Sequence, residues 1–272
     1  MTRVIVLTGA AGRLGRGLRP ALAGACDVLR LVDQAPVEAS HPREEAWRLD
    51  LGDTAALARV MAGASAVVHF AGHPREAGWD VLLPANIVGA INLWDAARAA
   101  GVQRIVYASS NHAVGMYPRS QKIDNAALPR PDSRYGLTKV FMESLAELHW
   151  HKHGLRGFGI RIGHCAPAPT DARMLSHWVH PDDLAALVQV GLTADYGSEW
   201  VYGVSANARS WWHDERAAAL GFRARHSADA FTADLKGRVT DDPVAEHFQG
   251  GSFAAAECSA RPSGLAESVP AR

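Results

Sequence analysis

The sequence has few cysteines and no excess of either charge. Cys26, Cys165 and Cys258 lie far apart without a CxxC pair, which argues against a disulfide framework and a cysteine zinc site. The 28 lysines and arginines balance 28 aspartates and glutamates, which argues against nucleic-acid or membrane-surface binding. No apolar stretch approaches the roughly 18 residues of a membrane span. We expect a soluble, cytoplasmic protein with no metal site and no nucleic-acid or membrane partner.

The chain is long and apolar enough to fold around a sizeable core. Its 272 residues suit one large domain or two small ones, and 48% of them are hydrophobic. Short valine- and isoleucine-rich runs alternate with helical stretches, which predicts a parallel sheet with helices on both faces. The expected strands are 4–7, 28–32, 47–49, 66–70, 105–108, 157–162 and 200–204. The expected helices are 14–23, 54–61, 83–100, 135–153 and 182–194.

Three glycines lie between the first expected strand and the first helix. Gly9 permits a tight turn, Gly12 lets the backbone approach a pyrophosphate, and Gly15 lets helix and strand pack closely. The helix start, with Arg13 and Leu14, offers free N–H groups to the phosphates. The spacing alone is weak because 25 glycines produce many spacings by chance, and an ordinary glycine turn is the alternative. Its position between strand and helix favours a dinucleotide.

An acidic residue follows the second strand, where it selects the dinucleotide. Asp33 lies about 20 residues beyond the turn, where a carboxylate accepts hydrogen bonds from ribose and repels a 2′-phosphate. This favours NAD over NADP; a helix N-cap or a solvated loop acid is the alternative. Asp50 and Leu51 close the third strand near the expected adenine, although a surface acid explains Asp50 almost as well. By position we add to the cofactor site Phe70, Ala71, Gly72, Ile162 and Cys165.

After residue 162 the alternation of strands and helices breaks, and prolines punctuate a loop-rich stretch. We expect an NAD-binding domain at 1–162 that carries the catalytic residues. A small substrate-binding part at 163–258 packs on that domain, and a disordered tail follows at 259–272. The fold class is α/β: a Rossmann-type doubly wound parallel sheet with a small C-terminal substrate-binding cap.

Tyr135 and Lys139 lie four residues apart, so a helix brings both side chains to one face. A phenol titrates near a pKa of about 10, which is too high for a base at neutral pH. A lysine ammonium and a cationic nicotinamide favour the phenolate, which then takes a proton from an alcohol as hydride leaves. Ser110, after the fifth strand, can orient the reacting oxygen. A turn serine and a helix-surface pair without function are the alternatives.

These residues, in this order, resemble the extended short-chain dehydrogenase/reductase superfamily of NAD-dependent epimerases and dehydratases. Within the superfamily, the chain is similar to the uronate dehydrogenase family over about residues 3–253. The segments that carry the narrower likeness are Ala108-Ser109-Ser110-Asn111-His112, Arg161-Ile162-Gly163, Arg173-Met174-Leu175-Ser176-x-Trp178, His180-x-Asp182-Asp183 and Phe248-Gln249-Gly250-Gly251-x-Phe253.

The narrower resemblance implies a reaction and a role for each catalytic residue. The reaction is NAD-dependent oxidation of C1 of D-galacturonate and/or D-glucuronate to the aldaric acid lactone. The resemblance makes Tyr135 the base. It implies that Lys139 binds the nicotinamide ribose and tunes the tyrosine, and that Ser110 orients the substrate.

The resemblance also implies which residues hold the sugar. Asn111 and His112 hydrogen-bond its hydroxyls, and Arg173 holds its carboxylate through a bidentate fork. A packed structural histidine is the alternative for His112, and a solvated loop arginine for Arg173. Two positions depart from the family: His73-Pro74 stands where a hydroxyl residue is usual, and His164, also placed with the substrate, where serine is usual. Both lie near the sugar in that family, so the preference among uronic acids is open.

Other interpretations remain for the whole chain and for one histidine pair. A sugar-nucleotide epimerase or dehydratase usually needs a larger C-terminal part, and a non-catalytic NAD-sensing protein has no use for a tuned phenol. His149 and His153 are one helical turn apart, but no carboxylate completes a metal set, and cations favour a helix C-terminus. The superfamily also implies a homo-oligomer, from dimer to hexamer, that pairs the helices at 83–100 and 135–153.

Overall fold

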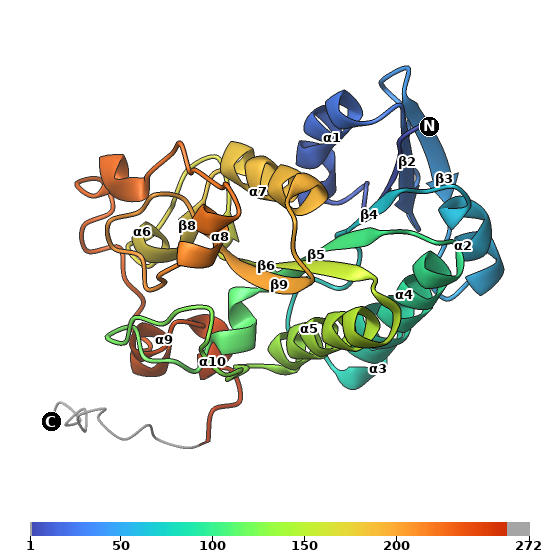
Figure 1. Ribbon diagram of the computed structural model, residues 1–272. Coiled ribbons are helices and arrows are strands. Elements are labelled where there is room, and N and C mark those ends of the chain that lie inside the picture. Colours follow the sequence, from blue (N-terminus) through green and yellow to red (C-terminus); the bar gives the residue numbers. More distant parts are fainter. Residues whose placement is uncertain (1, 260–272) are drawn as a thin grey trace, which may run out of the picture.

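A parallel seven-stranded sheet forms the centre of the computed structural model, which describes residues 2–259. The strand order is β3-β2-β1-β4-β5-β6-β9 (Figure 1). These strands are β1 (Val4–Thr8), β2 (Val28–Asp33), β3 (Glu44–Arg48), β4 (Ala66–His69), β5 (Arg104–Ser110), β6 (Arg156–Ile162) and β9 (Ser198–Gly203). A short pair, β7 (His164–Cys165) and β8 (Trp178–Val179), lies apart from this sheet. The predicted Rossmann-type α/β fold is confirmed; the expected tail beyond residue 259 lies outside the described residues.

Helices cover both faces of the sheet (Figure 1). One face carries α1 (Arg13–Ala25) and α7 (Pro181–Thr193), and the other carries α2 (Thr54–Met61), α4 (Gly89–Ala99) and α5 (Arg134–His153). The remaining helices are α3 (Trp79–Leu82), η1 (Leu83–Val88), η2 (Asn111–Val114), α6 (Met174–His177), α8 (Glu215–Ala219), η3 (Ala228–Phe231), α9 (Pro243–His247) and α10 (Ser252–Ala255). Within residues 2–259, no helix is long and apolar enough to cross a bilayer.

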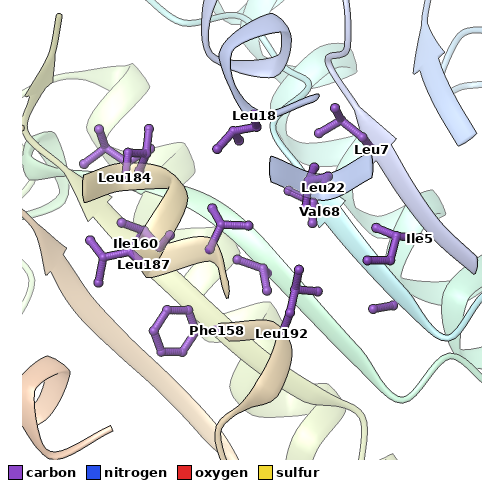
Figure 2. Packing of buried hydrophobic residues seen from close by; sticks show 14 of the residues in the cluster. Ile5, Leu7, Leu18, Leu22, Val68, Phe158, Ile160, Leu184, Leu187 and Leu192 are labelled. Atoms are coloured by element: carbon purple, nitrogen blue, oxygen red, sulfur yellow. The ribbon is translucent and has the colours of Figure 1, made fainter. Parts of the chain in front are cut away.

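Alternating residues of the buried strands divide the core between the two faces. In β1, Ile5 and Leu7 join the cluster under α1 and α7, whereas Val4 and Val6 join the cluster on the other face. Figure 2 shows the first cluster, in which Leu22 of α1 lies beside Val68 of β4, and Leu187 of α7 lies beside Ile160 of β6. Burial on both faces explains why the strands are almost wholly apolar.

The strand order changes direction at β1, and this creates the crevice where ligands bind in such sheets. β1 pairs with β2 on one side and with β4 on the other. The loops after β1 and β4 therefore diverge at the carboxyl edge of the sheet, which is the usual position of a bound dinucleotide.

Most predicted elements match to within two residues at each end, and two differ by more. The third strand covers Glu44–Arg48 and not 47–49; buried Glu44 pairs with Arg19, so an ion pair makes a charged strand start possible. The helix expected at 83–100 begins as the π-helix η1, which continues directly from α3, and α-helical geometry resumes at Gly89. There the Asn86 amide bonds both backbone groups of His73 and the Thr138 hydroxyl, which holds the wider turn in place.

The end of the described chain folds back under η2 (Figure 1). Gln249 N–H donates to the Tyr117 carbonyl at 2.9 Å, and Gly250 N–H donates to the Gly115 carbonyl at 2.8 Å. Residues 249–253 therefore lie beside the segment that follows β5, although they are more than 130 positions away in the sequence.

A buried ion pair joins α5 to the sheet. Arg161, fully buried in β6, donates from Nε and Nη2 to the two Glu143 oxygens, each at 2.8 Å. The Ser109 hydroxyl donates to the same carboxylate at 2.6 Å. Such a pair orients the two elements more than it stabilises them, but removal of one partner leaves an uncompensated charge.

We expect Glu143→Ala to lower the free energy of unfolding by about 3–5 kcal/mol, because Arg161 loses its counter-ion. The control is Glu147→Ala on the same helix, where the partly exposed carboxylate pairs with the exposed His151 side chain at 3.1 Å. Urea denaturation of both variants measures the difference. Equal stabilities of the two variants would contradict the argument.

Candidate active site

The glycine turn after β1 has no space for side chains at two of its glycines. Gly9 has a φ of +74°, and a Cβ there would lie 2.6 Å from the Phe70 carbonyl. A Cβ on Gly15 would lie 2.1 Å from the Gly9 carbonyl oxygen. Among the described residues no side chain caps α1, so the N–H groups of its first turn are available to an anion. The turn is a cradle that suits a pyrophosphate.

Asp33 lies beside this cradle, at the end of β2. One carboxylate oxygen accepts a hydrogen bond from Ala11 N–H at 2.9 Å, and the other accepts from Ala35 N–H at 3.0 Å. Carboxylate oxygens accept more than one hydrogen bond each, so both can still receive ribose hydroxyls. The structure brings the expected acid to the expected phosphate site.

The other segments predicted for the cofactor lie at the same sheet edge. Exposed Asp50 accepts from Gly52 N–H at 2.7 Å, a turn contact that also fits a surface acid. The Leu51 carbonyl accepts from the Asn92 amide at 2.9 Å. Residues 70–72 follow β4 beside Gly9. Their contacts with an adenine or a ribose stay predictions.

Arg13 connects the glycine turn to the loop after β6. Its guanidinium donates to the Cys165 carbonyl. Burial raises the pKa of the Cys165 thiol to about 11, although Arg13 opposes this. The thiol is therefore protonated at neutral pH and suits a lining role, not that of a nucleophile. Buried Ile162 ends β6 at the same edge.

Ser110, Tyr135 and Lys139 come together, as their spacing predicts. A hydrogen bond links the Ser110 hydroxyl with the Tyr135 phenol. Lys139 Nζ donates to the Ala108 carbonyl at 2.9 Å and lies 5.3 Å from the centroid of the Tyr135 ring. All three side chains are buried, so a hydroxyl, a phenol and an amine share one water-poor space.

The protein's own groups do not lower the pKa of Tyr135 as the sequence predicts. Burial raises the pKa of Tyr135 to about 12, and the Ser110 hydrogen bond offsets this only in part. Burial also lowers the pKa of Lys139 to about 8, although Glu143 favours its charged form. The four-residue spacing predicts that the amine and the phenol are neighbours. It does not predict their burial, which opposes charge on both groups. The contribution of a cationic nicotinamide stays a prediction.

Asn111 and His112 follow Ser110 in η2. Asn111 is buried, and its Nδ2 has no hydrogen-bond partner within the described residues. His112 Nδ1 lies 2.7 Å from Asp132 Oδ2, and its ring stacks on Phe253 with 4.0 Å between centroids. A buried amide without a partner is costly unless a ligand supplies one, so this corner suits a polar ligand.

Arg173 is a largely buried cation with no carboxylate at ion-pair distance among the described residues, although the charges of Asp171, Asp132 and Glu246 partly stabilise it. Nη1 donates to His177 Nε2 at 3.0 Å, Nη2 donates to the Gln249 carbonyl, and the inaccessible Nε has no partner. Within residues 2–259 no carboxylate pairs with it. Burial and the nearby Arg119 lower its pKa to about 10. This environment differs from that of a solvated loop arginine and favours an anionic ligand.

Two neutral histidines flank Arg173. His177 Nδ1 donates to the Arg173 carbonyl at 2.9 Å, which leaves Nε2 as the acceptor for the guanidinium. Burial holds the pKa of His177 well below its ordinary value. Burial first, then Arg13 and Arg173, lower the pKa of His164. At neutral pH His164 therefore adds no positive charge to the site.

Three acidic residues that contact the site residues were not predicted from the sequence. Glu143 lies one turn beyond Lys139 on the same stripe of α5, a spacing that could have identified it. Asp132 stands directly before Ser133, the N-cap of α5, and such polar pairs are helix-start signals. Glu76 accepts from Tyr135 N–H at 2.8 Å, and only the fold brings it there.

A hollow of about 590 Å³ borders Arg173. Arg119, Asp171, Arg238 and Glu246 also line it. None of Ser110, Tyr135 and Lys139 does, so this hollow is not itself the space where their chemistry occurs.

His180, Asp182 and His226 bring potential metal ligands within 4.8 Å of one another. However, the two imidazoles stack with 3.6 Å between centroids and 14° between planes, so their lone pairs lie in nearly parallel planes and do not converge. His180 Nδ1 already accepts from Asp182 N–H at 3.1 Å. This arrangement suits a stacked pair at the start of α7 better than a metal centre.

Comparisons with known proteins agree with this geometry. The model of the NAD dependent epimerase/dehydratase family matches residues 5–213. The chain is 41% identical to a uronate dehydrogenase from Pseudomonas putida over 93% of this chain and 96% of that protein. The structure resembles uronate dehydrogenase from Agrobacterium tumefaciens in complex with NAD (TM-score 0.89, 36% identity, 94% and 98% of the two chains). It equally resembles glucuronic acid dehydrogenase from Chromohalobacter salexigens (TM-score 0.89, 40% identity, the same coverage).

We expect Gly15→Ala to weaken NAD binding about tenfold or more, since the new Cβ would collide with the Gly9 carbonyl and 1.4 kcal/mol corresponds to a factor of ten. The control is Gly17→Ala in the same helix, where an added Cβ meets nothing within 4 Å. Titration followed by tryptophan fluorescence measures both affinities. If Gly15→Ala binds NAD as tightly as Gly17→Ala, the cradle is not the phosphate site.

Proposed function

Since the chain belongs to the NAD-dependent epimerase/dehydratase family, we propose that it is a uronate dehydrogenase. It oxidises C1 of D-galacturonate and/or D-glucuronate to the aldaric acid lactone, and NAD is the oxidant. The likeness to uronate dehydrogenases covers more than nine-tenths of the chain, which supports this over other activities of the family.

The observation that carries the proposal is the unpaired Arg173 cation. A largely buried guanidinium with an unsatisfied Nε and no carboxylate partner among the described residues is costly unless a ligand supplies the negative charge. A uronate carboxylate supplies that charge in a planar form that matches the guanidinium fork. A neutral sugar would leave the arginine unpaired, so the site discriminates against it.

The residues at the carboxyl edge fit NAD. The glycine turn offers backbone N–H groups to the pyrophosphate, and Asp33 stands where a ribose lies and a 2′-phosphate would be repelled. When bound, NAD supplies a hydride acceptor. Lys139 lies where it can bind the nicotinamide ribose.

Tyr135 is the base in this proposal. Its phenol shares a hydrogen bond with Ser110, so one sugar hydroxyl can contact both oxygens and be oriented by them. The phenolate takes the proton of the C1 hydroxyl while the hydride leaves C1. Because burial favours the neutral phenol, Lys139 beside its ring and a nearby positive charge must favour the phenolate.

The remaining polar groups bind the sugar. Asn111 Nδ2 is a buried donor without a partner, and His112 presents an imidazole beside the phenol. His164 stands near Arg173 where the family tends to have serine, and His73-Pro74 is the second departure. These two positions decide between the C4 epimers galacturonate and glucuronate, or leave both as substrates.

The decisive measurement is NADH absorbance with galacturonate, glucuronate, glucose and UDP-glucose in turn. We expect absorbance to rise with one or both uronates only. A rise with glucose but not with uronates would reject the role of Arg173. No rise with any of them would favour the two alternatives, a sugar-nucleotide epimerase or dehydratase, or an NAD-sensing protein.

A cytoplasmic homo-oligomer is part of the proposal. Exposed apolar side chains gather on α3, η1, α4 and α5, the helices expected to pair across a two-fold axis. They are Trp79, Val81, Leu83, Val88, Ile91, Leu137 and Leu148. A second copy would cover this face. The division at residue 162 into an NAD-binding domain and a substrate-binding part also stays a proposal.

We expect Tyr135→Phe to lower kcat by about 100-fold or more, because a general base typically contributes 10²–10⁴. The ring and its packing remain, so NAD affinity should stay within twofold of the unchanged protein. Steady-state rates and fluorescence titration measure the two quantities. Turnover close to that of the unchanged protein would reject Tyr135 as the base.

We expect Arg173→Ala to lower kcat/KM for uronates about 10- to 100-fold, mostly through KM, because hydrogen bonds to charged groups contribute about 1.5–3 kcal/mol. The control is Arg238→Ala, which removes an exposed arginine from the same hollow. An unchanged KM in Arg173→Ala would place the carboxylate elsewhere.

A further inference from the structure

We propose that Asp132 is a positioning residue that fixes the proton of His112 on Nδ1, so that Nε2 accepts a hydrogen bond from a sugar hydroxyl. The inference rests on the proposed function, since the hydroxyl belongs to the uronate. It starts from one contact: Asp132 Oδ2 lies 2.7 Å from His112 Nδ1. The Asp132 side chain is completely buried.

The hydrogen bonds around Asp132 decide which atom holds the proton. Its Oδ1 accepts from the Ser133 hydroxyl at 2.7 Å. Ser133 Oγ in turn accepts from Gly136 N–H at 2.9 Å, so its proton is free to point at Asp132. An ionised carboxylate has no proton to donate, so Oδ2 also acts as an acceptor and the proton shared with His112 comes from Nδ1. A neutral His112 then has its lone pair on Nε2.

Three glycines from distant segments hold the carboxylate in one place. A Cβ on Gly115 would lie 1.8 Å from Asp132 Oδ2, and one on Gly250 would lie 1.9 Å from the same atom. A Cβ on Gly136 would lie 3.1 Å from Oδ1. The carboxylate thus fills a cradle that accepts no larger residue, which restricts its rotation. Its direction toward His112 is set by packing as well as by hydrogen bonding.

The imidazole is fixed on its faces and open at one edge. It stacks on Phe253 at 14° between planes and meets the Tyr135 ring edge-on, with 5.7 Å between centroids. Within residues 2–259, Nε2 has no hydrogen-bond partner, and the side chain is 15% exposed. The free acceptor therefore lies beside the phenol that receives the substrate.

Beside Asn111 and Arg173, the site needs a hydrogen-bond acceptor. Asn111 Nδ2 and Arg173 Nε are both donors without partners in the described part of the chain. A pyranose hydroxyl that accepts from such a donor still has a proton of its own to place. His112 Nε2 receives that proton only if Asp132 keeps Nδ1 protonated. With Nε2 protonated instead, donors would face donors.

The test uses Asp132→Asn, which keeps the size of the side chain. The orientation that preserves the Ser133 hydrogen bond turns the amide NH₂ toward His112 Nδ1, so the imidazole proton moves to Nε2. We expect KM for the uronate to rise about tenfold with little change in kcat, because the lost hydrogen bond exists in both ground and transition states. KM for NAD should not change. Asp229→Asn, at an exposed acid whose carboxylate accepts from Ala208 N–H, controls for the lost charge.

Two readouts separate positioning from a general structural effect. Nitrogen-15 NMR of labelled imidazoles should show His112 protonated at Nδ1 in the unchanged protein and at Nε2 in Asp132→Asn; the signal missing from His112→Gln assigns it. In the His112→Gln background, Asp132→Asn should add no further loss in kcat/KM. Additive losses, or Nε2 protonation in the unchanged protein, would overturn the inference. Failure of the proposed function appears differently, as no oxidation of uronates by the unchanged protein.

Discussion

The alignment of α5 against the end of β5 is the constraint on which the site depends. Three residues on one stripe of the helix each bind one of three consecutive strand residues. The pairs are Lys139 with Ala108, Glu143 with Ser109, and Tyr135 with Ser110. A shift of one residue along either element would break all three contacts together. The same contacts that dock the helix therefore bring the hydroxyl, the phenol and the amine into one buried space.

Arg161 and Arg173 show how the environment of a guanidinium changes its pKa. Arg161 holds Glu143 bidentately, and that carboxylate raises its pKa despite burial. Arg173 has neutral partners, His177 and the Gln249 carbonyl, and its pKa falls. The first charge is neutralised within the fold. The second is held in place by neutral acceptors, so its charge is left for an anion, and the protein bears the cost of an incomplete site.

Local spacing predicts much of this structure, and distant packing accounts for the rest. The glycine turn, Asp33 and the pair Tyr135 and Lys139 could be identified because each depends on one turn, one strand end or one helix face. The start of β3 could not, since an ion pair from α1 buries Glu44. The π-turn at η1 depends on Asn86, whose amide bonds two other segments, and the raised pKa of Tyr135 depends on its burial. Neither the π-turn nor this pKa can be predicted from the adjacent residues in the sequence.

Residues 249–253 pack beside the segment that follows β5 and contact two of the predicted site residues. Phe253 supplies the face on which His112 stacks, and the Gln249 carbonyl anchors Arg173. The seven-stranded sheet and the glycine turn, in contrast, are built entirely from residues before 204. A chain shortened before residue 249 would therefore keep every strand of the sheet but lose the ring on which His112 stacks and the carbonyl that accepts from Arg173.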